Sequence, residues 1–129
     1  MKFFTLLVAA LLVGGLGGCA SAVKAPAPAV VAAAKFDPVP ANLKEQIKAQ
    51  FGAMLKDPYS ATYQFGPAKK VYFQGPDHMM FGYMVEVVVN AKNSYGGYTG
   101  GEVYYWTWSE GNLYNTKNSV KFGGTALLE

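Results

Sequence analysis

Few side chains in this 129-residue chain could carry chemistry, because it holds one cysteine and one histidine. Catalysis by His78 would need a nucleophile and an orienting group beside it, and no serine stands in the context of a nucleophile elbow. His78 ends the run Gly-Pro-Asp-His, which is typical of a turn, and Asp77 beside it could pair with it. We therefore expect a histidine in a surface turn. A usual zinc site would need several cysteine or histidine ligands. We therefore predict no catalytic residue, no metal site and no cofactor.

Glu86 is the acid whose surroundings leave two interpretations open. It stands among valines in a predicted strand, where it could be a buried acid with a raised pKa that marks a site. We favour the other interpretation, in which its carboxylate points to solvent from the open face of a sheet. Glycosidase chemistry would also need a second carboxylate at a set distance, and no other acid is an evident partner.

The single thiol, Cys19, offers a different chemistry. It closes the run Leu16-Gly17-Gly18-Cys19, which follows Lys2 and a nearly unbroken apolar stretch over 3–16. Those 14 residues form a secretory signal pattern, and they are shorter than the roughly 20 residues that a bilayer-spanning helix needs. The run resembles the lipobox of bacterial lipoproteins, in which an aliphatic residue and two small residues precede the cysteine.

That resemblance implies that the chain is cut before Cys19, that its thiol receives a diacylglyceryl group and that the new amine is acylated, with palmitate as an expected acyl chain. Ala20 and Ser21 follow, where an aspartate would imply retention in the inner membrane. We therefore expect a lipoprotein of the outer membrane that faces the periplasm. The domains predicted are a cleaved signal peptide over 1–18, a lipidated Ala/Pro-rich tether over 19–40 and one small domain over 41–129.

The composition of the mature part excludes some partners. Removal of Lys2 with the signal peptide leaves ten lysines against eight acids, and the chain has no arginine. Sites for nucleic acids and phosphates usually use arginine for bidentate contacts, so we expect no nucleic-acid partner. No cysteine remains for a disulfide, so the fold must depend on its hydrophobic core. The aromatic residues, concentrated after residue 50, can supply that core; the whole chain has nine tyrosines, eight phenylalanines and two tryptophans.

Apolar periodicity predicts an α+β fold, with one N-terminal amphipathic helix packed on a small antiparallel β-meander of three to five strands. The proline-rich stretch 20–40 should be an extended spacer. A helix over 42–55 should begin with a capping box of Asn42 and Glu45 and end at Asp57. Its predicted apolar face is Leu43, Ile47, Phe51, Met54 and Leu55. Strands are predicted over 60–65, 69–73, 81–90 and 102–109 and from residue 113, and we expect little order after residue 115.

A long loop over 90–101, with four glycines, joins the two best predicted strands. Small uncharacterised bacterial proteins pair a helix ending in Leu-Lys-Asp-Pro-x-Ser-Ala with a later Val-Asn-Ala-Lys-Asn-x-Tyr-Gly-Gly-Tyr-x-Gly. This chain resembles them over 55–61 and 89–100, although members often carry a cysteine before the second motif and this chain does not. The resemblance implies a shared domain and brings no established activity.

The loop supplies Asn93, Tyr95 and Tyr98 as candidate binding residues, because Tyr and Asn suit a peptide or a sugar. The alternative is a structural hairpin whose glycines supply positive φ. Trp106 and Trp108 join the candidates if they form an exposed aromatic strip; core packing is the alternative.

The leading hypothesis is a non-catalytic envelope module that binds an envelope protein or peptidoglycan. The alternatives are a small envelope hydrolase or hydrolase inhibitor using the loop, and an accessory lipoprotein of a secretion or pilus assembly.

Overall fold

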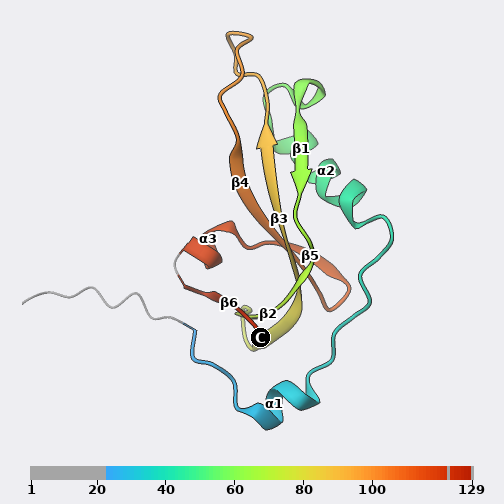
Figure 1. Cartoon of the computed structure of the whole chain (residues 1–129), viewed down its shortest axis with the longest axis vertical. Coiled ribbons are helices and arrows are strands. Elements are labelled where there is room, and N and C mark those ends of the chain that lie inside the picture. The colour runs from blue at the N-terminus through green and yellow to red at the C-terminus, as the bar shows by residue number, and fades with distance from the viewer. Residues whose placement is uncertain (1–22, 122, 129) are drawn as a thin grey trace, which may run out of the picture.

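The structure, a computed structural model, describes residues 23–121 and 123–128, so the predictions for the signal peptide and Cys19 lie outside the described residues. Helices combine with a six-stranded antiparallel sheet, which confirms the α+β class (Figure 1). In chain order the elements are α1 (Pro28–Ala33), α2 (Leu43–Met54), the 3-10 helix η1 (Pro58–Ser60), β1 (Thr62–Phe65), β2 (Lys69–Gln74), β3 (Met79–Asn90), β4 (Glu102–Ser109), β5 (Asn112–Asn115), α3 (Lys117–Lys121) and β6 (Thr125–Leu127).

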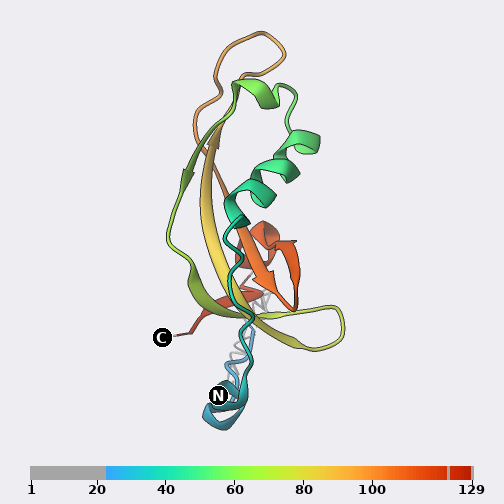
Figure 2. The same ribbon diagram turned by 90° about the vertical axis from the view of Figure 1, so that its right-hand side faces the viewer.

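The sheet is organised around the 12-residue strand β3. One edge of β3 pairs with β4, and the other edge pairs first with β2 and then with β1. The turn at Gly66 and Pro67 separates β1 from β2, because proline cannot donate a hydrogen bond to a sheet. β3 is strongly curved (Figure 2). At Gly82 a Cβ would lie 2.2 Å from the carbonyl oxygen of Trp108, so only glycine fits there.

The main core lies between α2 and one face of this sheet (Figure 2). The predicted apolar stripe of α2 buries Leu43, Ile47 and Phe51, while Met54 at its end is 47% exposed. The Phe51 ring contacts the rings of Tyr104, Tyr63 and Trp106, at centroid distances of 4.9, 5.6 and 5.8 Å. Valines of β3 complete the cluster: Val85, Val87 and Val89.

A second, smaller cluster lies on the opposite face of the sheet. It contains Val71, Phe73 and Met80, with Met84 and Tyr114 packed against it. Successive side chains of a strand point to opposite faces, so the even-numbered Met80 and Met84 face away from α2. The sheet therefore has an apolar cluster on each of its two faces.

The ends of α2 differ in detail from the prediction. The Asn42 side chain makes no capping bond to the backbone and instead accepts a hydrogen bond from Gln46 Nε2 at 2.9 Å, so the capping box with Glu45 does not form. Asp57 caps η1 rather than ending α2, because its Oδ1 accepts from the Ser60 backbone N–H at 3.3 Å. Pro58 occupies the first position of η1, where no donor is needed.

Two segments expected to lack regular structure have it. Residues 28–33 form α1, which Pro28 begins, and Phe36 packs edge-on against Phe81 and Tyr83 at 6.0 and 5.6 Å. Phe81 and Tyr83 face the same side of the sheet as α2, so the described part of the predicted tether lies on the domain. After residue 115, α3 and β6 form because β6 pairs with β2, which brings the strands to six rather than three to five.

Lysines of α2 lie over the aromatic rings of β1. Lys44 Nζ is 5.6 Å from the Phe65 ring centre, and Lys48 Nζ is 5.7 Å from that of Tyr63. β1 pairs only with β3 among the described strands, so its outer edge is open. The two lysines therefore stand beside the free edge of the sheet.

The contact of α2 with the sheet gives a stability prediction. The change Phe51→Ala removes a fully buried ring and should lower the free energy of unfolding by about 3–5 kcal/mol, measured by urea denaturation. The control Met54→Ala removes an exposed side chain of the same helix and should change it by less than about 1 kcal/mol. Equal effects of the two changes would mean that α2 does not pack on the sheet.

Candidate functional site

Two segments far apart in the sequence meet at one end of the molecule. η1 lies beside the loop over 91–101, above the end of β3 (Figure 1). Ser60 joins them, because its Oγ accepts from the Lys92 backbone N–H at 2.9 Å and its carbonyl accepts from the Tyr98 hydroxyl at 3.1 Å. Lys56 Nζ donates to Ser94 Oγ at 3.0 Å. We call η1, Lys56 and the loop over 91–101 the tip.

The loop of the tip holds its own conformation. A bridge between Lys92 and Tyr98 continues the hairpin beyond β3 and β4. Asn93 Oδ1 accepts hydrogen bonds from the backbone N–H groups of Tyr95 at 2.9 Å and Gly97 at 3.2 Å. Gly96 has a φ of 79°, which favours glycine. Asn93 therefore shapes the loop, and its side-chain oxygen is already occupied.

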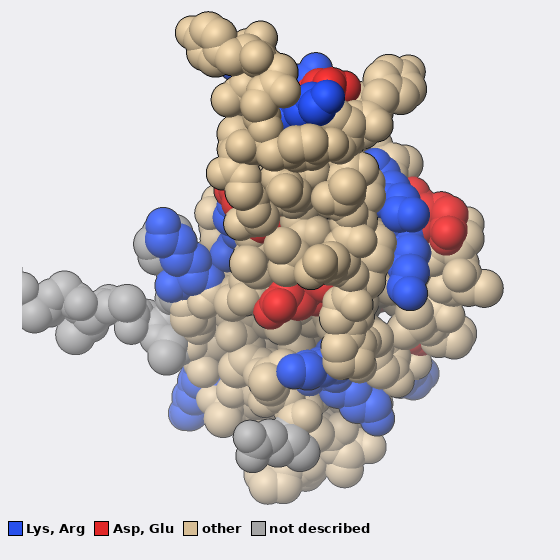
Figure 3. Space-filling view, turned by 45° about the horizontal axis from the view of Figure 1, so that its top comes forward, with Lys and Arg blue, Asp and Glu red and all other residues tan. Residues whose placement is uncertain are grey.

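Tyrosines project from both segments of the tip. Tyr59 on η1 is 100% exposed and Tyr95 on the loop is 96% exposed. Tyr98 is half exposed; its hydroxyl binds Ser60, and Lys92 Nζ lies 5.6 Å from the centre of its ring. Figure 3, with this end turned forward, shows basic and acidic side chains together among uncharged ones. Tyr59 is not among the binding residues predicted from the sequence, although it stands inside the motif over 55–61.

The two segments of the tip fall almost wholly within residues 55–61 and 89–100, the two motifs named in the sequence analysis. The first motif contains Lys56 and Ser60, and the second contains Lys92, Ser94 and Tyr98. Hydrogen bonds join residues of one motif directly to residues of the other.

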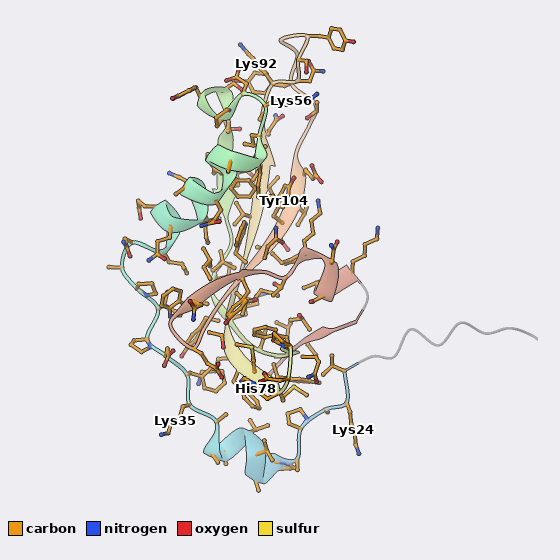
Figure 4. The ribbon with its side chains drawn as sticks, turned by 180° about the vertical axis from the view of Figure 1, so that it is seen from behind. Lys24, Lys35, Lys56, His78, Lys92 and Tyr104 are labelled. Atoms are coloured by element: carbon orange, nitrogen blue, oxygen red, sulfur yellow. The ribbon has the colours of Figure 1, made fainter. Side chains whose placement is uncertain are left out.

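The predicted aromatic strip of β4 is not an exposed surface. Trp106 is only 4% exposed, because it pairs with Val85 on the face that α2 covers. Trp108 is half-buried against the same core. Tyr104 (Figure 4) also faces this core, where burial raises its pKa, while its hydroxyl reaches out to Glu102 Oε2 at 3.0 Å. Core packing, the alternative named above, is the correct interpretation for these residues.

The contact of Lys56 with Ser94 is the nearest approach to a nucleophile and its base at the tip. A lysine acts as a base where it is buried among apolar groups or beside another cation in a dry site. Lys56 and Ser94 are both exposed. The pair is therefore a contact between the two segments of the tip rather than an active-site pair.

His78 and Glu86 do not meet. His78 lies in the exposed turn between β2 and β3, where its Nδ1 contacts Asp77 Oδ1 at 2.6 Å, as predicted, and its Nε2 contacts Glu110 Oε1 at 2.9 Å. Glu110 stands in the turn after β4, 32 residues from His78 along the chain, so this second contact could not be predicted from the sequence. His78 lies toward the end of the molecule opposite the tip (Figure 4).

Glu86 is exposed and lines a pocket of about 330 Å³ on the face of the sheet away from α2. Lys69, Tyr105 and Thr125 contribute the other polar side chains of this pocket. Its position agrees with the favoured interpretation of a carboxylate that points to solvent.

Within residues 23–121 and 123–128, no group of three or more His, Cys, Asp or Glu side chains could hold a metal ion. None of the helices described is long and apolar enough to cross a bilayer. Comparisons with protein families, with curated proteins and with solved structures find no match to this chain. The function must therefore be argued from the geometry of the tip and from the sequence.

The contacts of His78 predict that the stability of the fold depends on pH. The hydrogen bond with Glu110 and then that with Asp77 raise the pKa of His78 above its ordinary 6.5. A pKa raised by folding stabilises the fold fully below pH 6.5, and this stabilisation is lost as the pH rises through the folded-state value. NMR titration of the imidazole should therefore give a midpoint above 6.5, and Glu110→Gln should lower it.

The matched control is Glu45→Gln, which makes the same change on the exposed side of α2. It should leave the midpoint of His78 where it is. A midpoint that does not respond to Glu110→Gln would show that the two turns are not joined through His78.

The hydrogen bond from the Tyr98 hydroxyl to the Ser60 carbonyl should hold the loop over 91–101 against η1. Tyr98→Phe removes one hydroxyl and should lower the free energy of unfolding by about 0.5–1.5 kcal/mol. Amide hydrogen exchange over 91–101 should become faster, because the loop loses a contact with η1. Tyr95→Phe, which removes an exposed hydroxyl from the same loop, should change neither quantity. Unchanged exchange in Tyr98→Phe would mean that this bond does not hold the loop.

Proposed function

We propose that this protein is a lipid-anchored, non-catalytic module of the bacterial envelope that binds an envelope protein or a cell-wall component through its tip. The sequence Leu16-Gly17-Gly18-Cys19 supports the lipid anchor. The observation that carries the binding role is the pair of exposed tyrosines, Tyr59 and Tyr95, on two segments that hydrogen bonds hold together.

Tyrosine suits a contact surface because it offers a large, rigid, amphipathic side chain that loses little conformational entropy on binding. It is also enriched in protein interfaces relative to the rest of the surface. At the tip, the loop is fixed by Asn93 and by the contacts with Ser60. A partner therefore meets a preorganised surface, which reduces the ordering cost of binding.

The charges beside these tyrosines favour a polar ligand. Lys56 and Lys92 lie at the end of the molecule that carries the tip (Figure 4). Their contacts with Ser94 and with the ring of Tyr98 hold both ammonium groups against the loop. Carbonyl, hydroxyl or carboxylate groups of a peptide or a cell-wall glycan can accept hydrogen bonds from such lysines while the tyrosine rings supply apolar contact.

The test is photo-crosslinking in living cells from a photoreactive residue placed at Tyr95. The same residue at Asn118, exposed on α3, is the control for random capture. We expect one envelope protein or cell-wall fragment to be captured from Tyr95 and not from Asn118. Cys19→Ala should reduce the capture, because the protein loses its place at the membrane.

The change Tyr59→Ala, combined with the crosslinker at Tyr95, tests whether both tyrosines contact the partner. Capture should fall at least tenfold, as expected for a hot-spot tyrosine, while the thermal midpoint stays nearly unchanged because the ring is fully exposed. Capture that is equal from Tyr95 and Asn118 would refute the binding role of the tip. A large fall in the midpoint would make Tyr59 structural.

A further inference from the structure

α1 and the tip lie at opposite ends of the long axis of the molecule (Figure 1). Lys24 and Lys35 flank α1 on its two sides, and Lys56 and Lys92 lie at the other end (Figure 4). Any surface that binds α1 therefore leaves the tip pointing away from it.

α1 exposes an apolar surface that no described element covers. None of its six residues is buried, and Val30 is 48% exposed. Next to it lies a shallow, mainly apolar groove of about 550 Å³, lined by Ala25, Pro26, Ala27, Val30 and Met79 together with Lys24. Apolar surface flanked by lysines is the pattern of segments that lie on a membrane interface.

The charged residues within the segment that carries α1 are of one sign. Residues 20–36 include Lys24 and Lys35 and no acid, and both lysines are exposed. The first acid that follows is Asp37. Lysines near an anionic lipid surface each raise the affinity by roughly fivefold, so this segment suits anionic headgroups.

The segment that carries α1 is fixed to the domain at both of its ends. The Val23 backbone N–H donates to the Gly123 carbonyl at 2.8 Å, and Phe36 packs on Phe81 and Tyr83 under Lys70, whose Nζ lies 4.8 Å from the centre of the Phe36 ring. Movement of α1 therefore moves the domain with it, which a free tether would not do.

The proposed lipid attachment lies close to this end. Cys19 precedes Val23 by four residues, which span at most about 14 Å at ~3.5 Å per residue. The acyl chains would therefore hold α1 near the bilayer at a high effective concentration, so that weak contacts of two lysines and one apolar turn suffice to orient the domain.

We infer that α1, with Lys24 and Lys35, is a membrane-contact surface for anionic phospholipids, which holds the domain upright on the bilayer with the tip directed away from it. The inference rests on the lipid anchor of the proposed function. It adds a second contact with the membrane and a fixed direction for the tip.

The test uses the mature chain over 19–129, coupled through its only cysteine to a maleimide phospholipid in vesicles. Coupling in this way makes the test independent of lipidation in the cell. Acetylation rates of single lysines by an uncharged N-hydroxysuccinimide ester are measured by mass spectrometry, on phosphatidylglycerol-containing vesicles, on phosphatidylcholine vesicles and in the uncoupled protein.

We expect Lys24 and Lys35 to react at least threefold more slowly on the anionic vesicles than in the uncoupled protein. Lys56, exposed at the tip, is the internal control and should keep its rate. The protection should fall in 0.5 M salt, because salt screens charges at the bilayer surface. Val30→Asp should weaken the protection at both lysines without changing the thermal midpoint, since Val30 is exposed.

Equal rates of Lys24 and Lys35 on anionic vesicles and in the uncoupled protein would overturn the inference. So would equal protection on phosphatidylcholine, or protection of Lys56 to the same degree, which would place the domain on its side. Mass spectrometry of the protein purified from bacteria tests the anchor separately. An unmodified Cys19 there would refute the anchor of the proposed function while leaving the vesicle result to decide whether α1 contacts lipid.

Discussion

The fold depends on burying one apolar face of strand β3 away from water. β3 carries Val85, Val87 and Val89 on a single face, and without a disulfide only packing can keep that face from water. α2 covers it through Phe51, whose ring touches aromatic residues of both β1 and β4. The same contact fixes where α2 lies on the sheet, and η1 begins a few residues after the end of α2. The position of the tip is therefore a consequence of how β3 is buried.

The tip and the opposite end use different physical means to stay in place. At the tip, polar contacts between η1 and the loop suffice, with Ser60 accepting hydrogen bonds through both its side chain and its carbonyl. At the other end, the Phe36 ring lies on the sheet and a single backbone hydrogen bond holds Val23. Both ends are tied to β3 or its neighbours. One domain would therefore carry both the proposed partner-binding surface and the proposed membrane contact.

The sequence predicts the elements that have strong periodicity of their own. α2 begins and ends within one residue of its predicted bounds, and β3 and β4 occur where alternation predicts them. α1, α3 and β6 were missed because they are short and depend on contacts with distant residues. The side of the sheet that α2 covers cannot be predicted from one strand, so the sequence alone allows Trp106 to be either a core or a surface residue. Tyr59 was missed because its exposure depends on how η1 turns.

The lysines beside β1 have a consequence for the behaviour of many copies together. The open edge of β1 offers unpaired backbone groups, and such an edge invites pairing with a second sheet. Lys44 and Lys48 stand over the rings next to this edge, so a second copy that approaches edge to edge brings four ammonium groups together. Copies held on one leaflet by the proposed lipid anchor would meet in this way often, and repulsion between these lysines would oppose such pairing.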